Sequence, residues 1–134
     1  MKLKKSPASK KSPTKQYLYV YGDLQDDEKE AKVVARGKLR LRKSIEGIDA
    51  AARFDEDGIV YGQRRYVSED TLKFLDAVES PIYERVQIDT SEGPAWTFEY
   101  GRDNDVKFDK LDEIPGGNYF RFLDKLENTK LGKK

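Results

Sequence analysis

Proton transfer in this chain must use carboxylates, lysines, tyrosines or a chain terminus, because its 134 residues include neither histidine nor cysteine. The lack of histidine excludes Ser-His-Asp triads, histidine-ligated zinc and imidazole acid–base chemistry. The lack of cysteine excludes disulfides and thiolate metal sites. No spaced Asp/Asn/Gly loop of the calcium-binding type is present either. Metal binding by carboxylates alone stays open at this point, although we identify no residues for it and expect no metal.

Glu79 is the carboxylate best placed for such a transfer. It stands at the expected C-terminal end of a helix, where the macrodipole is negative, and burial there would also disfavour its ionised form. Both effects should raise the pKa of Glu79, and a carboxyl group with a raised pKa is a better proton shuttle near neutral pH. The structural alternative is a solvated glutamate at the end of a helix.

A tight turn follows the aromatic and β-branched residues at the start of the ordered chain. Its residues are Tyr21, Gly22, Asp23 and Leu24. Glycine permits a close backbone approach, and the amide N–H groups of such a turn can receive a carboxylate. The alternative is a plain strand-to-helix turn in which Asp23 caps a helix in the segment DLQDDEKE. An Asp23 side chain that instead faced a pocket would repel an anionic ligand.

Two tyrosines begin and end an expected hairpin and are further candidates for a site. Tyr83 opens a strand over residues 83–89, and Tyr100 closes the returning strand over residues 95–100, with the turn SEGP between them. Their hydroxyl groups could bind a ligand or hold Glu79 in place. The alternative is core packing with each hydroxyl at the surface.

The helix that would carry Glu79 has clear start and stop signals. Ser68 is a favourable N-cap, and two acidic residues follow it in the first turn. Apolar residues three apart, from Leu72 to Val78, predict one buried face that runs to Val78. Ser80 and Pro81 should end the helix.

Most of the remaining sequence predicts strands. The expected ranges before the helix are 17–21, 33–41, 48–54 and 59–67, with Gly37 as a bulge or a close backbone approach. The charged segment QDDEKEAK could form one or two helical turns, and NYFRFLDKLE near the end has helical spacing. We divide the chain into a disordered basic tail over residues 1–16, one domain over residues 17–127 and a frayed C-terminus over residues 128–134.

Three segments in order resemble the γ-glutamylcyclotransferase-like family (AIG2-like and BtrG-like proteins). YLYVYGDL resembles the family strand that ends in Tyr-Gly-Ser/Thr-Leu. GIVYGQRRYVSEDTLKFLDAVES is similar to a strand followed by a helix that ends in Leu-Asp-x-x-Glu-Gly/Ser, and PIYERVQIDTSEGPAWTFEYGR is similar to the Tyr-x-Arg strand with its return strand. IPGGNYFRF is a weaker match, and IDAA stands where the family often has Tyr-Pro-Ala. Together these segments cover about a hundred residues.

The resemblance implies an α/β (α+β) fold: a small mixed β-barrel of five to seven strands with one main helix beside it. It also implies a lyase that cleaves a small-molecule γ-glutamyl amine or peptide without water and needs no cofactor. In that family the substrate's α-amine attacks its own γ-carbonyl, which releases an amine and 5-oxoproline. Glu79 would be the acid–base, the turn Tyr21–Leu24 would hold the glutamyl portion, and Tyr83 and Tyr100 would line the pocket.

Two further functions stay open beside this one. Asp23 replaces the Ser or Thr of the family turn, and the segment after it lacks the common Gly-x-x-Asn, so the pocket could bind a small ligand with altered or lost chemistry. The first sixteen residues hold six lysines and no acidic residue, so the tail could bind nucleic acid or an acidic partner. No aromatic residue is interleaved with those lysines, which argues against a base-stacking platform.

The remaining expectations concern the surroundings of the protein. Removing the tail leaves 20 basic and 25 acidic residues, a net charge of −5, so a basic tail is joined to a mildly acidic body. No stretch approaches the ~20 apolar residues of a membrane span, and the tail has no apolar run after it as a secretory signal would. We therefore expect a cytoplasmic protein with no membrane contact. The oligomeric state cannot be read from the sequence.

Overall fold

The computed structural model of the chain describes residues 16–132. The predicted tail thus lies outside the described residues except for Gln16, which already belongs to the first strand. The strands of the described part are β1 (Gln16–Val20), β2 (Val33–Arg36), β3 (Lys38–Ser44), β4 (Gly47–Arg53), β5 (Ile59–Val67), β6 (Tyr83–Thr90), β7 (Gly93–Tyr100) and β8 (Asp112–Glu113). The helices are α1 (Glu69–Glu79) and α2 (Tyr119–Gly132), with short 3-10 turns η1 (Phe108–Lys110) and η2 (Pro115–Gly117).

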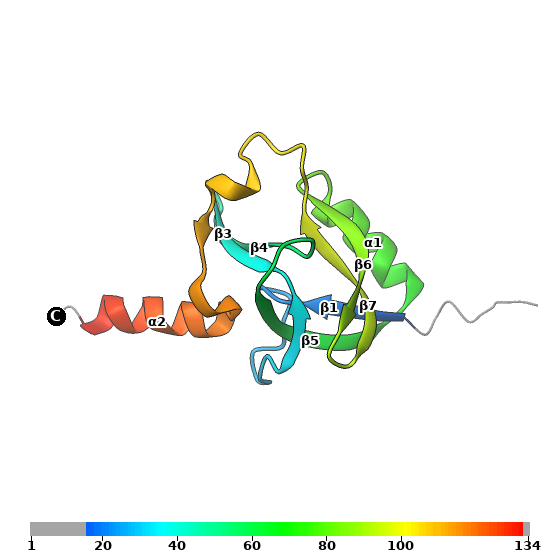
Figure 1. Cartoon of the computed structure of the whole chain (residues 1–134), viewed down its shortest axis with the longest axis horizontal. Helices are drawn as coiled ribbons and strands as arrows, with labels where there is room; N and C mark the ends of the chain where they lie inside the picture. Colours follow the sequence, from blue (N-terminus) through cyan, green and yellow to red (C-terminus); the bar gives the residue numbers. More distant parts are fainter. Residues whose placement is uncertain (1–15, 133–134) are drawn as a thin grey trace, which may run out of the picture.

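The strands form two sheets that curve into a partial barrel (Figure 1). The larger sheet has the order β2-β5-β1-β7-β6, and its central strand β1 runs antiparallel to β5 and parallel to β7. The smaller sheet has the order β4-β3-β8. The two edges of the larger sheet meet where Ser91 N–H donates to the Val34 carbonyl oxygen at 2.8 Å and Val34 N–H donates to Ser91 Oγ at 3.0 Å. The predicted mixed α+β barrel is confirmed, and the described residues form eight strands, one of them only two residues long, where five to seven were expected.

The central strands are buried on both faces, so alternate side chains enter two different apolar clusters. On β1, Leu18 and Val20 join the cluster that packs against α1, whereas Tyr19 packs with the smaller sheet. On β4, Ala51 faces the first of these clusters and its two neighbouring alanines face the second. The small alanine side chains allow β4 to lie close to the turn that follows β1, which is where the candidate site forms.

The helix α1 begins and ends where the sequence predicts. The Ser68 side chain accepts a hydrogen bond from the Thr71 N–H, as an N-cap does, and Ser80 is the C-cap. Leu72 and Leu75 are buried against the sheet. The predicted apolar face is wrong at its last residue, because Val78 is 56% exposed. At about 100° per residue, the position that continues the buried stripe after Leu72 is Glu79, seven residues on.

The predicted strand over residues 33–41 is two strands that belong to different sheets. They separate at Gly37, whose N–H donates to the Gly58 carbonyl oxygen at 3.0 Å. A Cβ atom on Gly37 would lie 2.9 Å from the carbonyl oxygen of Arg53. The close backbone approach expected at Gly37 is therefore present, and it marks the change of sheet.

The charged segment over residues 25–32 forms turns, not the helical turns that its composition allowed. The buried Gln63 side chain binds this segment by accepting from the Asp26 N–H at 2.8 Å and donating to the carbonyl oxygens of Asp26 and Lys29 at 2.8 and 3.1 Å. These three bonds from one amide replace those that a helical turn would supply.

The helix α2 starts at the predicted position and continues to Gly132, beyond the domain end expected at residue 127. Tyr119 is buried in its first turn, and Phe122 and Leu123 pack against the same cluster as Tyr19. The rest of α2 projects away from the sheets (Figure 1). In the described part of the chain, no helix has the length and apolar composition needed to cross a membrane.

Candidate functional site

A pocket of about 160 Å³ lies where β1 ends, between the turn after β1, strand β4 and the C-terminal end of α1. Six of the seven residues singled out as site candidates line it, five of them from the larger sheet and its connections. The full lining is Tyr19, Val20, Tyr21, Gly22, Asp23, Leu24, Asp49, Ala50, Glu79, Tyr83, Thr97 and Phe98. Strand, turn and helix segments that are up to eighty residues apart in the chain thus meet at one cavity.

Those five candidates, the turn residues Tyr21–Leu24 and Tyr83, come from the larger sheet and its connections, and a sixth, Glu79, reaches the pocket from the end of α1. Tyr100 is the seventh and does not line this pocket. Its hydroxyl donates to the carbonyl oxygen of Val106 at 2.6 Å, and its ring packs edge-on against Tyr83 behind the pocket wall. Tyr100 therefore supports Tyr83 and lines a separate cavity beside η1.

The turn after β1 lies against β4 at a distance that only glycine allows. A Cβ atom on Gly22 would lie 2.9 Å from the Cβ atom of Ala50. The turn is closed by the Gln25 N–H, which donates to the Gly22 carbonyl oxygen at 3.1 Å. Within residues 16–132, the N–H groups of Gly22, Asp23 and Leu24 donate to no other group of the protein. Three neighbouring residues that line the pocket thus have amide donors without a protein partner, which is what an anion site in a turn requires.

Asp23 does not have the capping role that was its alternative, because no helix follows it. Its side chain is exposed at the rim of the pocket, beside Leu24, which is 45% exposed. The hydroxyl of Tyr119, from the start of α2, lies near it: burial raises the pKa of Tyr119, and the negative charge of Asp23 raises it further. The turn thus brings one carboxylate to the entrance of the cavity.

Glu79 extends from the last turn of α1 into the pocket and is half-buried. Its carboxylate forms no hydrogen bond or ion pair with any residue of the described structure. Burial raises the pKa of Glu79, and the negative charge of Asp49 adds to the rise. The upward direction expected from the sequence is confirmed, with burial as its largest cause.

Asp49 is a pocket residue that sequence reasoning missed. It lies on β4 next to Ala50, and its Oδ2 atom accepts from Arg42 Nη1 at 3.4 Å. The Tyr83 hydroxyl donates to the Ala50 carbonyl oxygen at 2.8 Å, with Asp49 Oδ2 as a second acceptor at 3.2 Å. The Oδ1 atom of Asp49 is buried and has no partner among the described residues. Burial raises the pKa of Asp49, and Arg42 and the Tyr83 hydroxyl oppose that rise.

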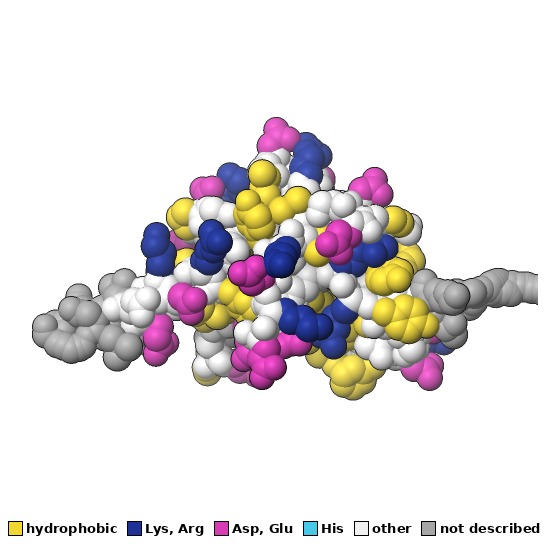
Figure 2. Space-filling view, turned by 90° about the horizontal axis from the view of Figure 1, so that it is seen from below, with side chains coloured by type: hydrophobic (Ala, Val, Ile, Leu, Met, Phe, Trp, Pro, Cys, Tyr) yellow, Lys and Arg dark blue, Asp and Glu magenta, His cyan; other side chains and the backbone are white. Residues whose placement is uncertain are grey.

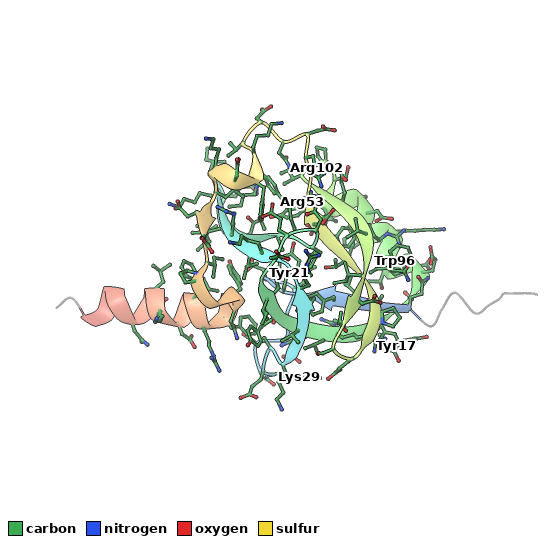
Figure 3. All side chains as sticks on the ribbon, in the orientation of Figure 1. Tyr17, Tyr21, Lys29, Arg53, Trp96 and Arg102 are labelled. Carbon is green, nitrogen blue, oxygen red and sulfur yellow. The ribbon has the colours of Figure 1, made fainter. Side chains whose placement is uncertain are left out.

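Tyr21 closes the inner end of the pocket. Its hydroxyl donates to the carbonyl oxygen of Phe98 at 2.5 Å, and its ring packs edge-on against Phe54. Figure 3 shows Tyr21 in the interior of the body, whereas Lys29 lies at its lower edge. Burial raises the pKa of the Tyr21 phenol far above its usual range, and the charge of Glu79 adds to this. Tyr21 is therefore a neutral wall group and not a proton carrier.

The charged side chains that line the pocket are all acidic. Asp23, Asp49 and Glu79 are its ionisable carboxyl groups, and no lysine or arginine is among the described residues that line it. Across residues 16–132, no three acidic side chains are arranged to hold a metal ion. The site thus combines free amide donors, which favour an anionic group, with carboxylates, which favour a cationic one. A zwitterion carries both kinds of group.

Comparison with known proteins gives one family for the chain. The model of the family described as gamma-glutamyl cyclotransferase, AIG2-like, matches residues 18–121. The gamma-L-glutamyl-butirosin B gamma-glutamyl cyclotransferase of Niallia circulans is 30% identical over 106 residues, which cover 65% of this chain and 68% of that protein.

Two solved structures have the same fold. The crystal structure of an uncharacterized protein from Pyrococcus horikoshii has a TM-score of 0.62 at 18% identity and covers 84% of this chain and 97% of that one. The solution structure of a protein from Arabidopsis thaliana has a TM-score of 0.60 at 22% identity and covers 92% of this chain and 90% of that one. At these identities the likeness concerns the fold alone.

Proposed function

Since the chain belongs to the gamma-glutamyl cyclotransferase, AIG2-like family, we propose that it is an enzyme that cleaves a small γ-glutamyl amine or peptide to 5-oxoproline and the free amine. The observation that carries the proposal is an unpaired, half-buried carboxylate, that of Glu79, which faces the same small pocket as three free backbone amides. Glu79 is the proton carrier in this proposal. The amide donors of the turn bind the glutamyl portion.

The reaction needs no water and no cofactor. The substrate enters with an α-ammonium group, and the Glu79 carboxylate takes a proton from it, which frees the lone pair of the α-nitrogen. That nitrogen attacks the γ-carbonyl carbon and forms the ring C–N bond, after which the bond from this carbon to the leaving nitrogen breaks. Over the whole reaction, two protons leave the α-nitrogen and two are taken up by the leaving nitrogen. The products are the 5-oxoproline carboxylate and an ammonium ion.

The raised pKa of Glu79 suits both halves of this transfer. A carboxylate with an ordinary pKa is too weak a base to take a proton readily from an ammonium group, whose pKa is much higher. A raised pKa of Glu79 reduces the difference between the two pKa values. The same group, once protonated, is positioned to return the proton to the leaving nitrogen. A proton shuttle of this kind contributes about 10²- to 10⁴-fold to a rate.

The size of the pocket limits what it can enclose. Its volume of about 160 Å³ is below the ~300–1,000 Å³ of sites that hold drug-sized ligands. The glutamyl portion is the part of the substrate that fits inside. The amine portion then extends past the rim formed by Asp23 and Leu24, so contacts outside the pocket select the amine. The relative from Niallia circulans is named for a gamma-glutamyl-butirosin substrate.

A second candidate function is a pocket protein that binds a small ligand without turning it over. The observation that favours it is the Asp23 carboxylate at the rim, where the family turn resembled by this sequence has Ser or Thr. A carboxylate there repels the α-carboxylate of a glutamyl group. Such a protein would be stabilised thermally by its ligand and would form no product.

The test is a panel of γ-glutamyl amines and γ-glutamyl dipeptides incubated with the full chain, with 5-oxoproline, glutamate and free amine all quantified. The proposal predicts 5-oxoproline and amine in equal amounts and no glutamate. Glutamate as the product would identify a hydrolase. Thermal stabilisation by a panel member that yields no product would instead support the second candidate.

A further inference from the structure

Asp49 gives the pocket a second inward carboxylate, and its surroundings differ from those of Glu79. Both residues line the same cavity, and the charge of Asp49 reaches Glu79 strongly enough to affect its ionisation. Asp49 Oδ2 is held by Arg42 and lies within reach of the Tyr83 hydroxyl, so the side chain is fixed in place. Glu79 has no such support and is free to exchange protons with a ligand.

The unsatisfied atom is Asp49 Oδ1. It is buried beside the cavity and accepts no hydrogen bond from any described residue. Buried carboxylate oxygens are normally paired, and one that is left unpaired costs the full desolvation of that atom. The side chain as a whole is 33% exposed, so a cationic group of a ligand in the pocket would offset that cost through the charge that the two carboxylate oxygens share. Because the group is a carboxylate, an ammonium donor would bind it better than a neutral amide.

On these contacts we propose that Asp49 is the residue that binds the α-ammonium group of the substrate and holds it beside Glu79. This inference rests on the proposed function for the identity of the ligand. The free amides of the turn then bind the α-carboxylate. The α-nitrogen is held with one proton directed to Asp49 and another to Glu79. Asp49 acts through charge and position, and Glu79 carries the protons.

The sequence position supports a role particular to this chain. Asp49 belongs to the segment IDAA, which stands where the resembled family often has Tyr-Pro-Ala. None of these three family residues has a carboxylate, so Asp49 departs from that pattern.

The test measures binding in the Glu79→Gln background, where turnover does not interfere. The probes are γ-glutamylethylamide and glutaric acid monoethylamide, which lacks only the α-amine. We expect Asp49→Asn to weaken binding of γ-glutamylethylamide by about 10- to 100-fold, as for a hydrogen bond to a charged group, and to change binding of the monoethylamide by less than about twofold. Asp57→Asn is the matched control, because Asp57 is an exposed carboxylate paired with Arg36 outside the pocket.

The outcomes separate this inference from the function on which it rests. Equal weakening of both probes would mean that Asp49 only holds Arg42 and Tyr83 in place, and it would overturn the inference. An unchanged affinity for γ-glutamylethylamide, or no binding of it before the Asp49 substitution, would overturn it as well. If the wild type releases 5-oxoproline and Asp49→Asn leaves its KM unchanged, the inference fails and the function stands. If Asp49-dependent binding occurs without any product, the function fails and the inference stands.

Discussion

Glu79 and Asp49 are chemically similar carboxylates that the fold gives different surroundings. Glu79 ends a helix and has no partner in the described structure, whereas Asp49 lies on a strand and is held by Arg42. Pairs of titratable groups whose surroundings differ in this way commonly divide the work of an active site between them. At the scale of the residue, the account therefore assigns proton transfer to the group that is free and electrostatic binding to the group that is fixed.

The first prediction concerns the pH dependence of kcat/KM. The free enzyme must hold Glu79 as a carboxylate in order to accept a proton, so kcat/KM rises with pH through the pKa of Glu79. Because burial and Asp49 raise that pKa above the ordinary value of 4.5, the acid limb lies above the usual glutamate range. Asp49→Asn removes one of the two causes and should move the limb to lower pH. If the acid limb of kcat/KM lies at the same pH in Asp49→Asn as in the wild type, the charge of Asp49 does not affect the pKa of Glu79.

The second prediction concerns stability. A carboxyl group whose pKa is raised by folding destabilises the folded state once the pH exceeds its ordinary pKa, and the effect is absent below that value. Glu79→Gln should therefore raise the melting temperature at pH 7, and the gain should vanish as the pH falls below 4.5. Thermal unfolding of both proteins across pH 3.5–8 measures this. A melting temperature that falls at pH 7 would mean that Glu79 has a stabilising partner.

The two carboxylates also differ in how far the sequence could identify them. Glu79 follows a helix with a clear N-cap and a clear stop, so its place at the helix end could be predicted. The direction of the Glu79 side chain into the pocket could not be predicted in this way. The apolar face of the helix was expected to include Val78, whereas the buried face continues to Glu79. Asp49 is a single acid among alanines in a strand, and its role depends on Arg42 and Tyr83, which pairing brings to it from other strands.

At the scale of the element, the site depends on the contact between the turn after β1 and strand β4. Gly22 and Ala50 meet there, and a Cβ atom on Gly22 would not fit without a shift. The same approach brings the turn residues and Asp49 to one pocket. The small residues of the two elements therefore set the width of the pocket.

The third prediction tests that contact. Gly22→Ala introduces a Cβ atom 2.9 Å from the Ala50 Cβ, and overpacking of this kind costs about 1–3 kcal/mol in the free energy of unfolding. Adding Ala50→Gly removes the clashing atom, so the double variant should lose less stability than the sum of the two single variants. Urea unfolding of the four proteins gives the coupling. If the stability losses of the two single variants simply add up in the double variant, the turn and β4 are not in tight contact at Gly22 and Ala50.

Elements with local signals were predicted well, and those determined by distant partners were not. Strand β5 and helix α1 have their predicted bounds because their composition and caps are local. The division of residues 33–41 between two sheets depends on the Gly37 contacts with Gly58 and Arg53, which no local pattern shows. The conformation of residues 25–32 could not be predicted for the same reason, because it depends on hydrogen bonds from the side-chain amide of Gln63 on another strand.

At the scale of the whole molecule, charge is distributed unevenly between the tail and the body. Residues 1–16 carry six lysines, and the remainder carries a net charge of −5. On the face shown in Figure 2, lysine and arginine side chains are interspersed with acidic ones and with apolar side chains, and neither sign forms a continuous field. The body thus offers no extended basic surface on that face for a polyanion.

The fourth prediction follows from this distribution. Deletion of residues 1–15 should leave the rate of 5-oxoproline release unchanged, since the pocket lies wholly within the described residues. The same deletion should remove any salt-sensitive binding of single-stranded DNA, because the lysines of the tail are the groups that would neutralise the DNA phosphates. Fluorescence anisotropy from about 20 to 200 mM salt measures that binding. Retention of DNA by the shortened chain would contradict the assignment of the basic charge to the tail.

The central claim, that Glu79 carries the protons of an intramolecular cyclisation, is tested most directly by the rate of 5-oxoproline release by the wild type and by Glu79→Gln. Glu92→Gln is the matched control, because Glu92 is an exposed residue of the β6–β7 turn. The account predicts release by the wild type and the control, and a loss of about 10²- to 10⁴-fold in a folded Glu79→Gln protein. A folded Glu79→Gln protein that released 5-oxoproline at the wild-type rate would contradict it.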